Sequence, residues 1–300
     1  MKKIFMLLAH QLSEAMIFTI GSLSKNKDDI VLVHIDGNSD ISKFLFLGSE
    51  NVIFVENRVN VKWGDWSVVE ATLNLMKLSC NYSYDYCFLI SGDDIPVMAS
   101  NEMNRMLYEN SGKDFIHFQD ERDNYTDAID RVIYSYKNYH FVKNGDLKTK
   151  SKVKLHKFFK KILFKKQEAI DIIDLYDFNI FKGTQWFTLQ SDTVHRILEF
   201  IESNLNLIFI FRDSFCPDET FFHSIIKYLC IETYHDPSKM NDALRYIDWQ
   251  SGPEYPKNLD ENDLSQLIGK GYFFARKVSR EVNKDFLKHY GDIVNGRAES

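Results

Sequence analysis

The chain has 300 residues, which is enough for one large α/β domain or two small ones. Its formal net charge of -6 argues against a general nucleic-acid-binding protein, so we expect no nucleic-acid partner. No stretch reaches the roughly 20 consecutive apolar residues that a membrane-spanning helix needs. No close spacing or CxxC motif links the four cysteines, which predicts reduced thiols in the core of a cytosolic protein; they are Cys80, Cys87, Cys216 and Cys230.

Strand-like and helix-like segments alternate over the first hundred residues. Residues 4–9 form a continuous apolar run that is too short for a signal peptide and is typical of a buried parallel strand. Periodicity predicts helices at about 13–23 and 67–78, and further strands at 29–36, 52–56 and 86–91. This alternation predicts an α/β fold with a mostly parallel, doubly wound central sheet flanked by helices.

Polar residues stand at the ends of these strands, where doubly wound sheets bind their ligands. His34 and Asp36 end the second strand, and Asp93 and Asp94 follow the fourth. Adjacent side chains of an extended chain point in opposite directions, so one of the two carboxylates can face a cleft while the other caps the following turn. The alternative is a metal site, and with it a metal-dependent phosphohydrolase.

Residues 101–300 are less regular than the first hundred. The pattern predicts strands at 115–118 and 184–189, a charged loop at 120–130, and helices at 192–204 and 218–228. It also predicts a largely helical tail at 260–290, interrupted near 269–271. No repeat or linker divides the chain, so we expect a single domain at 1–300. Residues 1–100 form its ligand-binding half, and residues 101–300 form its catalytic half with a basic insertion at about 143–166.

A strongly basic run extends from Lys148 to Lys166 without an acidic residue. On a helix its lysines would occupy much of one face and its apolar side chains the other, the apolar stripe being Leu155, Phe158, Phe159, Ile162 and Leu163. Such a helix can lie on an anionic membrane, where each basic residue adds about 1 kcal/mol near the surface. The alternatives are a solvated surface helix and a disordered insertion.

Residues 217–219 read Pro-Asp-Glu and open an apolar, helix-like run. Proline suits the first position of a helix and acidic residues suit the positive end of its dipole, so a capped helix start is one interpretation. The other interpretation is a catalytic site, in which Glu219 is a general base on a rigid element within reach of a substrate hydroxyl.

Several cations and a tryptophan follow this segment. Arg276 and Lys277 come after three apolar residues and are candidates for a clamp on a diphosphate, with Lys257 and Arg245 as further candidates. Trp249 is a candidate platform for the apolar face of a sugar. The alternatives are ordinary surface charge for the cations and core packing for the tryptophan.

Eight segments, taken in order, resemble glycosyltransferase family 14, which contains the core-2/I-branching β-1,6-N-acetylglucosaminyltransferases and the peptide O-xylosyltransferases. The segments are residues 8–10, 33–36, 63–73, 88–96, 183–189, 214–226, 244–249 and 273–277. No single segment is specific, but their order and spacing together are distinctive. The resemblance covers most of the chain.

The resemblance implies a GT-A type nucleotide-sugar fold and an inverting transfer from a UDP-sugar that needs no metal or other cofactor. In this family the glutamate of the Pro-Asp-Glu motif is the general base, which is Glu219 here. The lysine of the family's Phe-Ala-x-Lys segment contacts the donor diphosphate, which is Lys277 here. Trp249 matches a tryptophan that lines the acceptor site.

The remaining site residues are placed by the resemblance together with the candidates named above. The segment that carries a second diphosphate-binding cation in the branching enzymes is not recognisable here, so Lys257 is its substitute. At the donor we place Arg276, with Lys257 as the second cation, and the strand-end residues; the latter are His10, Asp36 and Asp94. At the acceptor we place Arg245 next to Trp249, together with two residues of the loop before the basic run, which are Glu121 and Arg131. We expect no metal ligand in this set.

The donor sugar stays open between N-acetylglucosamine and xylose, because residues 219–223 and 275–277 are closer to the xylosyltransferase branch. Animal relatives carry a membrane anchor and several disulfides, which this chain lacks. We therefore expect a cytoplasmic bacterial enzyme of surface polysaccharide synthesis. It would act on a glycan or lipid-linked glycan at the inner face of the plasma membrane, held there by the run from Lys148 to Lys166. The alternative is a noncatalytic nucleotide-sugar or glycan-binding protein that kept the fold.

Overall fold

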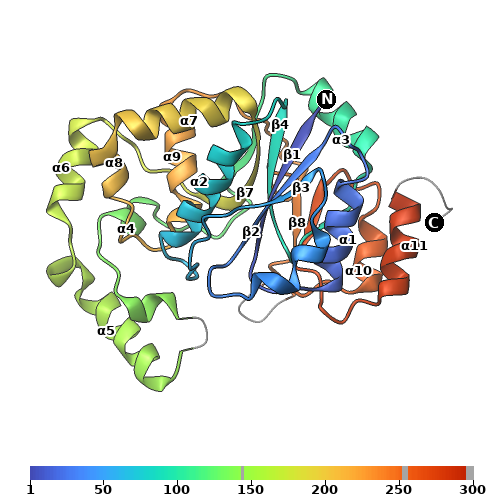
Figure 1. The fold of residues 1–300 in the computed structure, drawn as a ribbon. Helices are drawn as coiled ribbons and strands as arrows, with labels where there is room; N and C mark the ends of the chain where they lie inside the picture. The colour runs from blue at the N-terminus through green and yellow to red at the C-terminus, as the bar shows by residue number, and fades with distance from the viewer. Residues whose placement is uncertain (143–144, 252–255, 295–300) are drawn as a thin grey trace.

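A computed structural model describes residues 1–142, 145–251 and 256–294. Its centre is a six-stranded sheet with the strand order β3-β2-β1-β4-β7-β6 (Figure 1). The strands are β1 (Lys3–Ala9), β2 (Ile30–Ile35), β3 (Val52–Phe54), β4 (Tyr86–Ser91), β6 (Phe115–Phe118) and β7 (Gly183–Gln190). Strands β1 to β4 are parallel, whereas β7 runs antiparallel to both of its neighbours. The predicted α/β fold with a mostly parallel central sheet is confirmed.

Helices surround this sheet and connect its strands. They are α1 (Glu14–Leu23), α2 (Ser67–Ser79), α3 (Ser100–Glu109), α4 (Ile129–Val132), α5 (Leu147–Leu163), α6 (Gln167–Leu175), α7 (Ser191–Ser203), α8 (Leu205–Phe209), α9 (Phe221–Tyr228), α10 (Glu261–Leu267) and α11 (Lys284–Val294). Four short 3₁₀ turns complete the list: η1 (Ile41–Lys43), η2 (Leu45–Leu47), η3 (Asn138–Phe141) and η4 (Pro217–Glu219).

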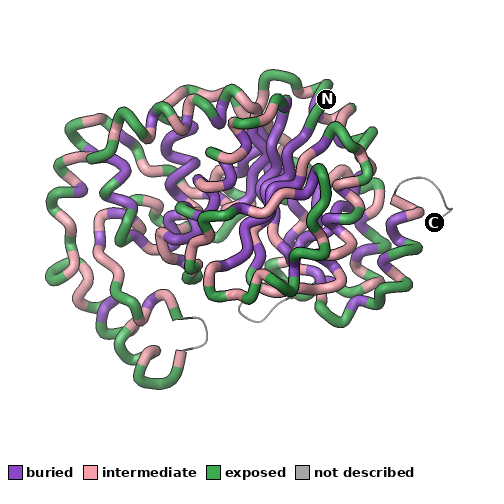
Figure 2. The backbone as a smooth tube through the Cα atoms, in the orientation of Figure 1, coloured by how far each residue is buried: buried purple, intermediate pink, exposed green. Residues whose placement is uncertain are grey.

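Both faces of the central sheet are covered, which explains why β1 is apolar along its whole length. Ile4 and Met6 belong to the core that also contains the inner faces of α2, α7 and α9. Phe5 and Leu7 point the other way and belong to the core under α1 and α3. The buried residues therefore concentrate along the strands at the centre of the molecule (Figure 2).

The direction of β7 decides what lies at the carboxyl edge of the sheet. Because β7 is antiparallel, its first residue, Gly183, lies where the other strands end, and it is paired with Phe118, the last residue of β6. A Cβ atom at Gly183 would lie 1.7 Å from the His117 carbonyl oxygen and 2.5 Å from His223 Nε2. Only glycine fits this position.

A second sheet of three short strands, in the order β5-β9-β8, packs with α10 and α11 around a smaller core. Its strands are β5 (Ile95–Pro96), β8 (Arg245–Ile247) and β9 (Phe274–Arg276). The expected helical tail at 260–290 is therefore wrong at its centre. Phe274 and Ala275 have no exposed surface, because β9 is enclosed by a strand on either side.

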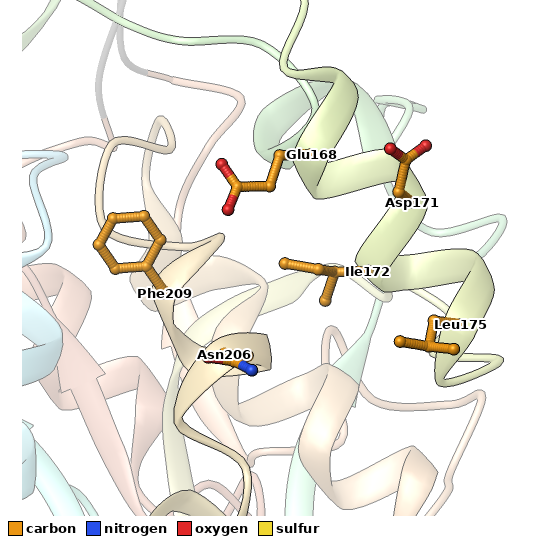
Figure 3. A pocket seen from close by; sticks show the side chains of 6 residues that line it. All are labelled: Glu168, Asp171, Ile172, Leu175, Asn206 and Phe209. Atoms are coloured by element: carbon orange, nitrogen blue, oxygen red, sulfur yellow. The ribbon is translucent and has the colours of Figure 1, made fainter.

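Helices α4, α5, α6 and α8 lie at the end of the molecule opposite α10 and α11 (Figure 1). A groove of about 460 Å³ separates α6 from α8 (Figure 3), and its lining residues are Glu168, Asp171, Ile172, Leu175, Asn206 and Phe209. None of the predicted site residues belongs to this groove. Within the described ranges, no helix is both long and apolar enough to cross a lipid bilayer.

Most predicted elements agree with the structure to within two residues. The predicted helix at 218–228 is wrong at its start, since η4 is a 3₁₀ turn and α9 begins only at Phe221. The pattern also missed α3, α6 and the strands of the second sheet. All four cysteines are free thiols, but Cys230 is exposed, so the expected core placement is wrong for that residue.

Candidate active site

The carboxyl ends of β1, β2 and β4 meet at one edge of the central sheet. His10 follows β1 and is exposed, whereas Asp36 follows β2 and is buried. Asp36 Oδ1 accepts the backbone N–H of Asn38 at 2.8 Å, so this carboxylate shapes the turn after β2. The structure thus brings both residues to the edge at which we expect the donor.

Glu219 is the last residue of η4, directly before α9, and its side chain is 31% exposed. Cys216, which precedes the turn, has a left-handed backbone with φ 49°. Its N–H donates to the carbonyl oxygen of Gly64 at 2.8 Å. Trp66 packs edge-on against Phe221, with ring centres 5.1 Å apart. The segment around Gly64 therefore holds the turn that carries Glu219.

Two cations face the Glu219 carboxylate. Lys182 Nζ lies 3.3 Å from Glu219 Oε2, and Arg131 Nη2 lies 3.6 Å from the same oxygen. The Arg131 guanidinium also lies 4.8 Å from the centre of the Phe215 ring, which fixes its position. The structure thus places Arg131, a predicted acceptor residue, directly beside the predicted base.

Sequence reasoning missed Lys182 as a site residue. The available signal was its position directly before Gly183 and a predicted strand. In a parallel strand that position would lie at the opposite edge of the sheet from the ligand. Only the antiparallel direction of β7 brings Lys182 to Glu219.

The residues that flank Glu219 differ in their ionisation. Burial and the adjacent Glu219 carboxylate raise the pKa of Asp218 to about 7, and Asp218 Oδ1 has no hydrogen-bond partner among the described residues. Burial lowers the pKa of His223 to about 3, and His223 Nε2 donates to the carbonyl oxygen of His117 at 3.1 Å. His223 is neutral and has no exposed surface, so it packs under Gly183 rather than transferring protons.

Two adjacent ion pairs join the end of β4 to the end of β9. In the inner pair, Asp94 Oδ1 lies 3.2 Å from Arg276 Nε, with side chains 0% and 10% exposed. The Arg276 guanidinium lies 3.9 Å from the centre of the Trp186 ring on β7. In the outer pair, Lys277 Nζ lies 3.4 Å from Asp93 Oδ2, and the Lys277 side chain is 30% exposed. Lys277 is therefore the cation of this cluster that a donor reaches more easily.

The inner pair corrects one of the predicted donor contacts. Asp94 accepts the backbone N–H of Ser91 at 2.8 Å and the Ser91 hydroxyl at 2.9 Å, and no part of its side chain is exposed. Asp94 and Arg276 consequently hold the loop in place: enclosed Asp94 offers no surface to a donor, and a donor contact of Arg276 stays a prediction. The two adjacent carboxylates differ in exposure, since Asp94 is enclosed and bonds back to Ser91 whereas Asp93 is 17% exposed beside Lys277. That one of them faces a cleft while the other caps the following turn stays a prediction.

The sequence also predicts Arg245 as an acceptor contact, and this prediction is wrong. It is fully buried, and its guanidinium donates to the carbonyl oxygens of Ala243 at 2.7 Å and Phe187 at 3.0 Å. A third bond, at 3.1 Å, goes to the Thr188 hydroxyl. Burial lowers the pKa of Arg245 to about 9. Arg245 therefore joins the second sheet to β7 from inside the molecule.

The other predicted contacts lie at the surface. Trp249 follows β8 and is 60% exposed, and Glu121 is exposed in the loop after β6. Lys257 Nζ lies 2.7 Å from Asp263 Oδ1, so its ammonium is engaged by the first turn of α10. The roles of Trp249 and Glu121 at an acceptor, and of Lys257 at a donor, stay predictions.

Two groups of histidines and carboxylates have the spacing of metal ligands, namely His117, Asp120 and Asp123, and Asp120, His235 and Asp242. A side chain of the protein already supplies a cation there. The Arg122 guanidinium lies 2.6 Å from Asp120 Oδ2 and 2.7 Å from Asp242 Oδ2. The cluster thus forms an internal ion-pair network that joins the loop after β6 to the segment before β8.

Comparison with known proteins identifies the family. Residues 4–268 match the Core-2/I-Branching enzyme family. The chain belongs to this family. Two curated relatives of this Core-2/I-Branching family member are Xylosyltransferase oxt of Drosophila melanogaster, 21% identical over 298 residues, and that of Drosophila pseudoobscura pseudoobscura, 20% identical over 301 residues. Each alignment covers 90% of this chain but only 31% and 30% of the two fly proteins, so the chain spans about a third of their length.

One similar solved structure is a Bacillus anthracis protein named as a glucose-1-phosphate thymidylyltransferase. It matches this Core-2/I-Branching family member with a TM-score of 0.40 and 13% identity, over 79% of this chain and 87% of that chain. This likeness is too distant to carry an argument. The family expected from the sequence is confirmed by the match over residues 4–268.

Proposed function

We propose that this chain is an inverting glycosyltransferase that moves a sugar from a UDP-sugar to a hydroxyl group of a glycan, with Glu219 as the general base. The observation that carries the proposal is the placement of Glu219. Its carboxylate is partly exposed at the sheet edge and is positioned by Lys182 and Arg131. The membership in a family of branching enzymes supports the same reaction.

The reaction follows from the chemistry of these groups. An acceptor hydroxyl has a pKa far above neutrality, so a base must take its proton as its oxygen attacks the anomeric carbon. Glu219 accepts that proton, a new carbon–oxygen bond forms, and the bond to the diphosphate breaks on the opposite face. The bonding electrons leave with the nucleoside diphosphate. A well-placed base contributes roughly two to four orders of magnitude in rate.

Lys277 meets the negative charge that develops on the leaving diphosphate. A fixed cation can stabilise this charge in a partly buried site without a metal ion. The arrangement of Asp93 and Asp94 supports metal independence, because each carboxylate already faces a cation of the protein. Transfer should therefore survive EDTA. Complete loss in EDTA that Mn²⁺ or Mg²⁺ restores would contradict this part of the proposal.

The central test compares Glu219→Gln with Glu199→Gln, which makes the same change at an exposed position on α7. Release of UDP is measured for UDP-N-acetylglucosamine, UDP-xylose and other nucleotide sugars, which also identifies the donor. Glu219→Gln should lower turnover at least about a hundredfold while UDP still binds. Glu199→Gln should behave like the wild type. Near-normal turnover of Glu219→Gln would remove Glu219 from the mechanism.

The acceptor and the place of action form the finer part of the proposal. We infer a glycan or lipid-linked glycan of bacterial surface polysaccharide synthesis, reached from the cytoplasmic face of a membrane. Helix α5 supports this, since its apolar stripe is unusually exposed: Leu155 61%, Phe158 79%, Ile162 78% and Leu163 66%. Lysines flank the stripe along the helix. An exposed apolar stripe with flanking lysines is typical of helices that bind anionic lipid surfaces.

Vesicle co-sedimentation tests the membrane part separately. The protein should bind vesicles that contain phosphatidylserine, lose that binding at high salt and ignore vesicles of phosphatidylcholine. Replacing Phe158 and Ile162 by glutamate should abolish the binding. The matched control replaces Leu45 and Phe46, an exposed apolar pair on η2, by glutamate. Equal loss in both variants, or no binding at low salt, would contradict docking through α5.

A further inference from the structure

Helix α5 also lines a cavity of about 910 Å³, here called the α5 cavity, on the side of the helix that faces the body of the protein. Its opposite wall comes from the segment between Thr126 and His140 and from Phe215. This volume is large enough for a sugar unit with an attached group. None of the residues predicted for the donor lines it.

The cavity adjoins the catalytic base through one residue. Arg131 lines the cavity, and its Nη2 atom lies 3.6 Å from Glu219 Oε2. Phe215, another lining residue, stacks under the Arg131 guanidinium and packs edge-on against Trp63, with ring centres 5.9 Å apart. A molecule in the α5 cavity is therefore held next to the point at which an acceptor hydroxyl must meet Glu219.

The charge of the wall is positive. Lys150, Lys154 and Lys157 line the cavity, are exposed and form no ion pair with a described residue. Two acidic residues also line the cavity. One of them, Asp130, is already ion-paired, because its Oδ2 lies 2.5 Å from Lys160 Nζ. A concentration of unpaired lysines has no structural need in a chain whose net charge is -6.

Two buried histidines pack within this wall. His140 is 8% exposed and His156 is 2% exposed, and both line the cavity. His156 Nε2 donates to the carbonyl oxygen of Ser135 at 2.9 Å. His156 Nδ1 and His140 Nε2 have no partner among the described residues. Both nitrogens are enclosed and the two rings pack against each other with centres 4.3 Å apart, so these histidines build the wall behind the lysines.

We propose that the α5 cavity binds an acidic group of the acceptor, a phosphate, diphosphate or carboxylate that lies next to the sugar being extended. This inference rests on the proposed transferase function and names its substrate class as an anionic glycan. The lysines bind the charged group, and the rings of Tyr136, Tyr139 and Phe215 contact the attached sugar or lipid. The acidic group can belong to a lipid diphosphate or to the glycan itself.

Binding experiments test this without requiring turnover. Isothermal titration calorimetry, with UDP present at saturation to fill the donor site, uses farnesyl diphosphate, glucose 6-phosphate and glucuronic acid as probes. Farnesol and glucose are the neutral controls. The cavity variant is Lys150→Gln/Lys154→Gln/Lys157→Gln. The matched control is Lys148→Gln/Lys152→Gln/Lys161→Gln, which removes the same charge from positions on α5 outside the cavity.

The cavity variant should bind the anionic probe at least about tenfold more weakly, as expected for lost charged hydrogen bonds. The control should change affinity less than about twofold, and both should melt like the wild type.

Preference for farnesyl diphosphate would assign the acid to a lipid, and preference for glucuronic acid would assign it to the glycan. Equal weakening in both variants, absence of probe binding, or displacement of the probe by UDP would overturn the proposal. Normal probe binding by Glu219→Gln separates this test from that of the base.

Discussion

The sheet edge and the α5 cavity differ in how their charges are held. At the sheet edge, Asp94 and Arg276 are enclosed, and each outer residue of the cluster has a partner. In the α5 cavity, Lys150, Lys154 and Lys157 line the space and form no ion pair with a described residue, whereas Lys160 pairs with Asp130. Substitutions at the sheet edge should therefore affect folding first. Changes in the cavity should affect ligand binding and leave the fold intact.

The largest effect is expected from Gly183→Ala at the sheet edge. The new methyl group would lie 1.7 Å from the His117 carbonyl oxygen, so β6, β7 or α9 must shift. We expect a loss of roughly 3 kcal/mol or more in the free energy of unfolding. Urea denaturation measures it, with Gly21→Ala in α1 as the control, because nothing lies within 4 Å of a Cβ there. A variant as stable as the wild type would contradict the tight packing at β7.

Substitutions of the two cations at the end of β9 should affect different properties, the stability of the fold for Arg276 and the affinity for UDP for Lys277. Arg276→Met leaves the Asp94 carboxylate buried without a counter-ion, which typically costs about 3–5 kcal/mol of stability. Lys277→Met removes a partly exposed pair and should cost about 1 kcal/mol or less. Its affinity for UDP should instead fall by about 1.5–3 kcal/mol, the value of a charged hydrogen bond. Urea denaturation and calorimetry with UDP distinguish the two outcomes, and equal stability losses would refute the distinction.

Lys182→Met tests the positioning of the base. Without Lys182, the Glu219 carboxylate keeps only the longer contact with Arg131. We expect about a tenfold fall in kcat with little change in KM or in melting temperature, because misplacement affects the transition state most. Lys182→Arg should restore most of the activity. If Lys182→Arg is as slow as Lys182→Met, the fall in kcat does not come from the loss of the positive charge that positions Glu219.

The smallest effect concerns the pH dependence of stability. The folded protein keeps a proton on Asp218 up to a pKa of about 7, whereas the usual value is 3.8. Between these pH values the folded state binds more protons than the unfolded state, so stability falls as pH rises. Asp218→Asn should remove this contribution and reduce the loss of melting temperature between pH 6 and pH 8 by about 3 °C, the shift expected for about 1.4 kcal/mol. Asp174→Asn, an exposed change on α6, should leave that loss unaltered.

The parallel half of the fold could be predicted because its signals are local. Each of the first strands is a short apolar run, and the covered sheet makes such runs apolar on both faces. The position of Glu219 at the start of a helix-like run was also visible, although the turn proved to be a 3₁₀ turn.

The site errors and the unexpected burial of two arginines have a common physical cause. Arg245 and Arg276 follow or precede apolar residues, which is compatible both with a ligand site and with burial. Which of these holds depends on pairing with β4 and β7, distant in the chain. Lys182 was missed for the same reason, since strand direction is not encoded in its local sequence. Burial of a charged side chain is a property of long-range pairing and not of its neighbours.

The register of β7 limits where this chain can tolerate changes in length. Side chains of a strand alternate between two faces, so inserting or deleting one residue turns every later side chain to the other face. In β7 such a change would move Trp186 away from Arg276, replace Gly183 beside His117, and move Lys182 relative to Glu219. The exposed turn at residues 111–112, between α3 and β6, carries no side chain of the site. Insertions and deletions should therefore collect in that turn, while the length of β7 stays fixed.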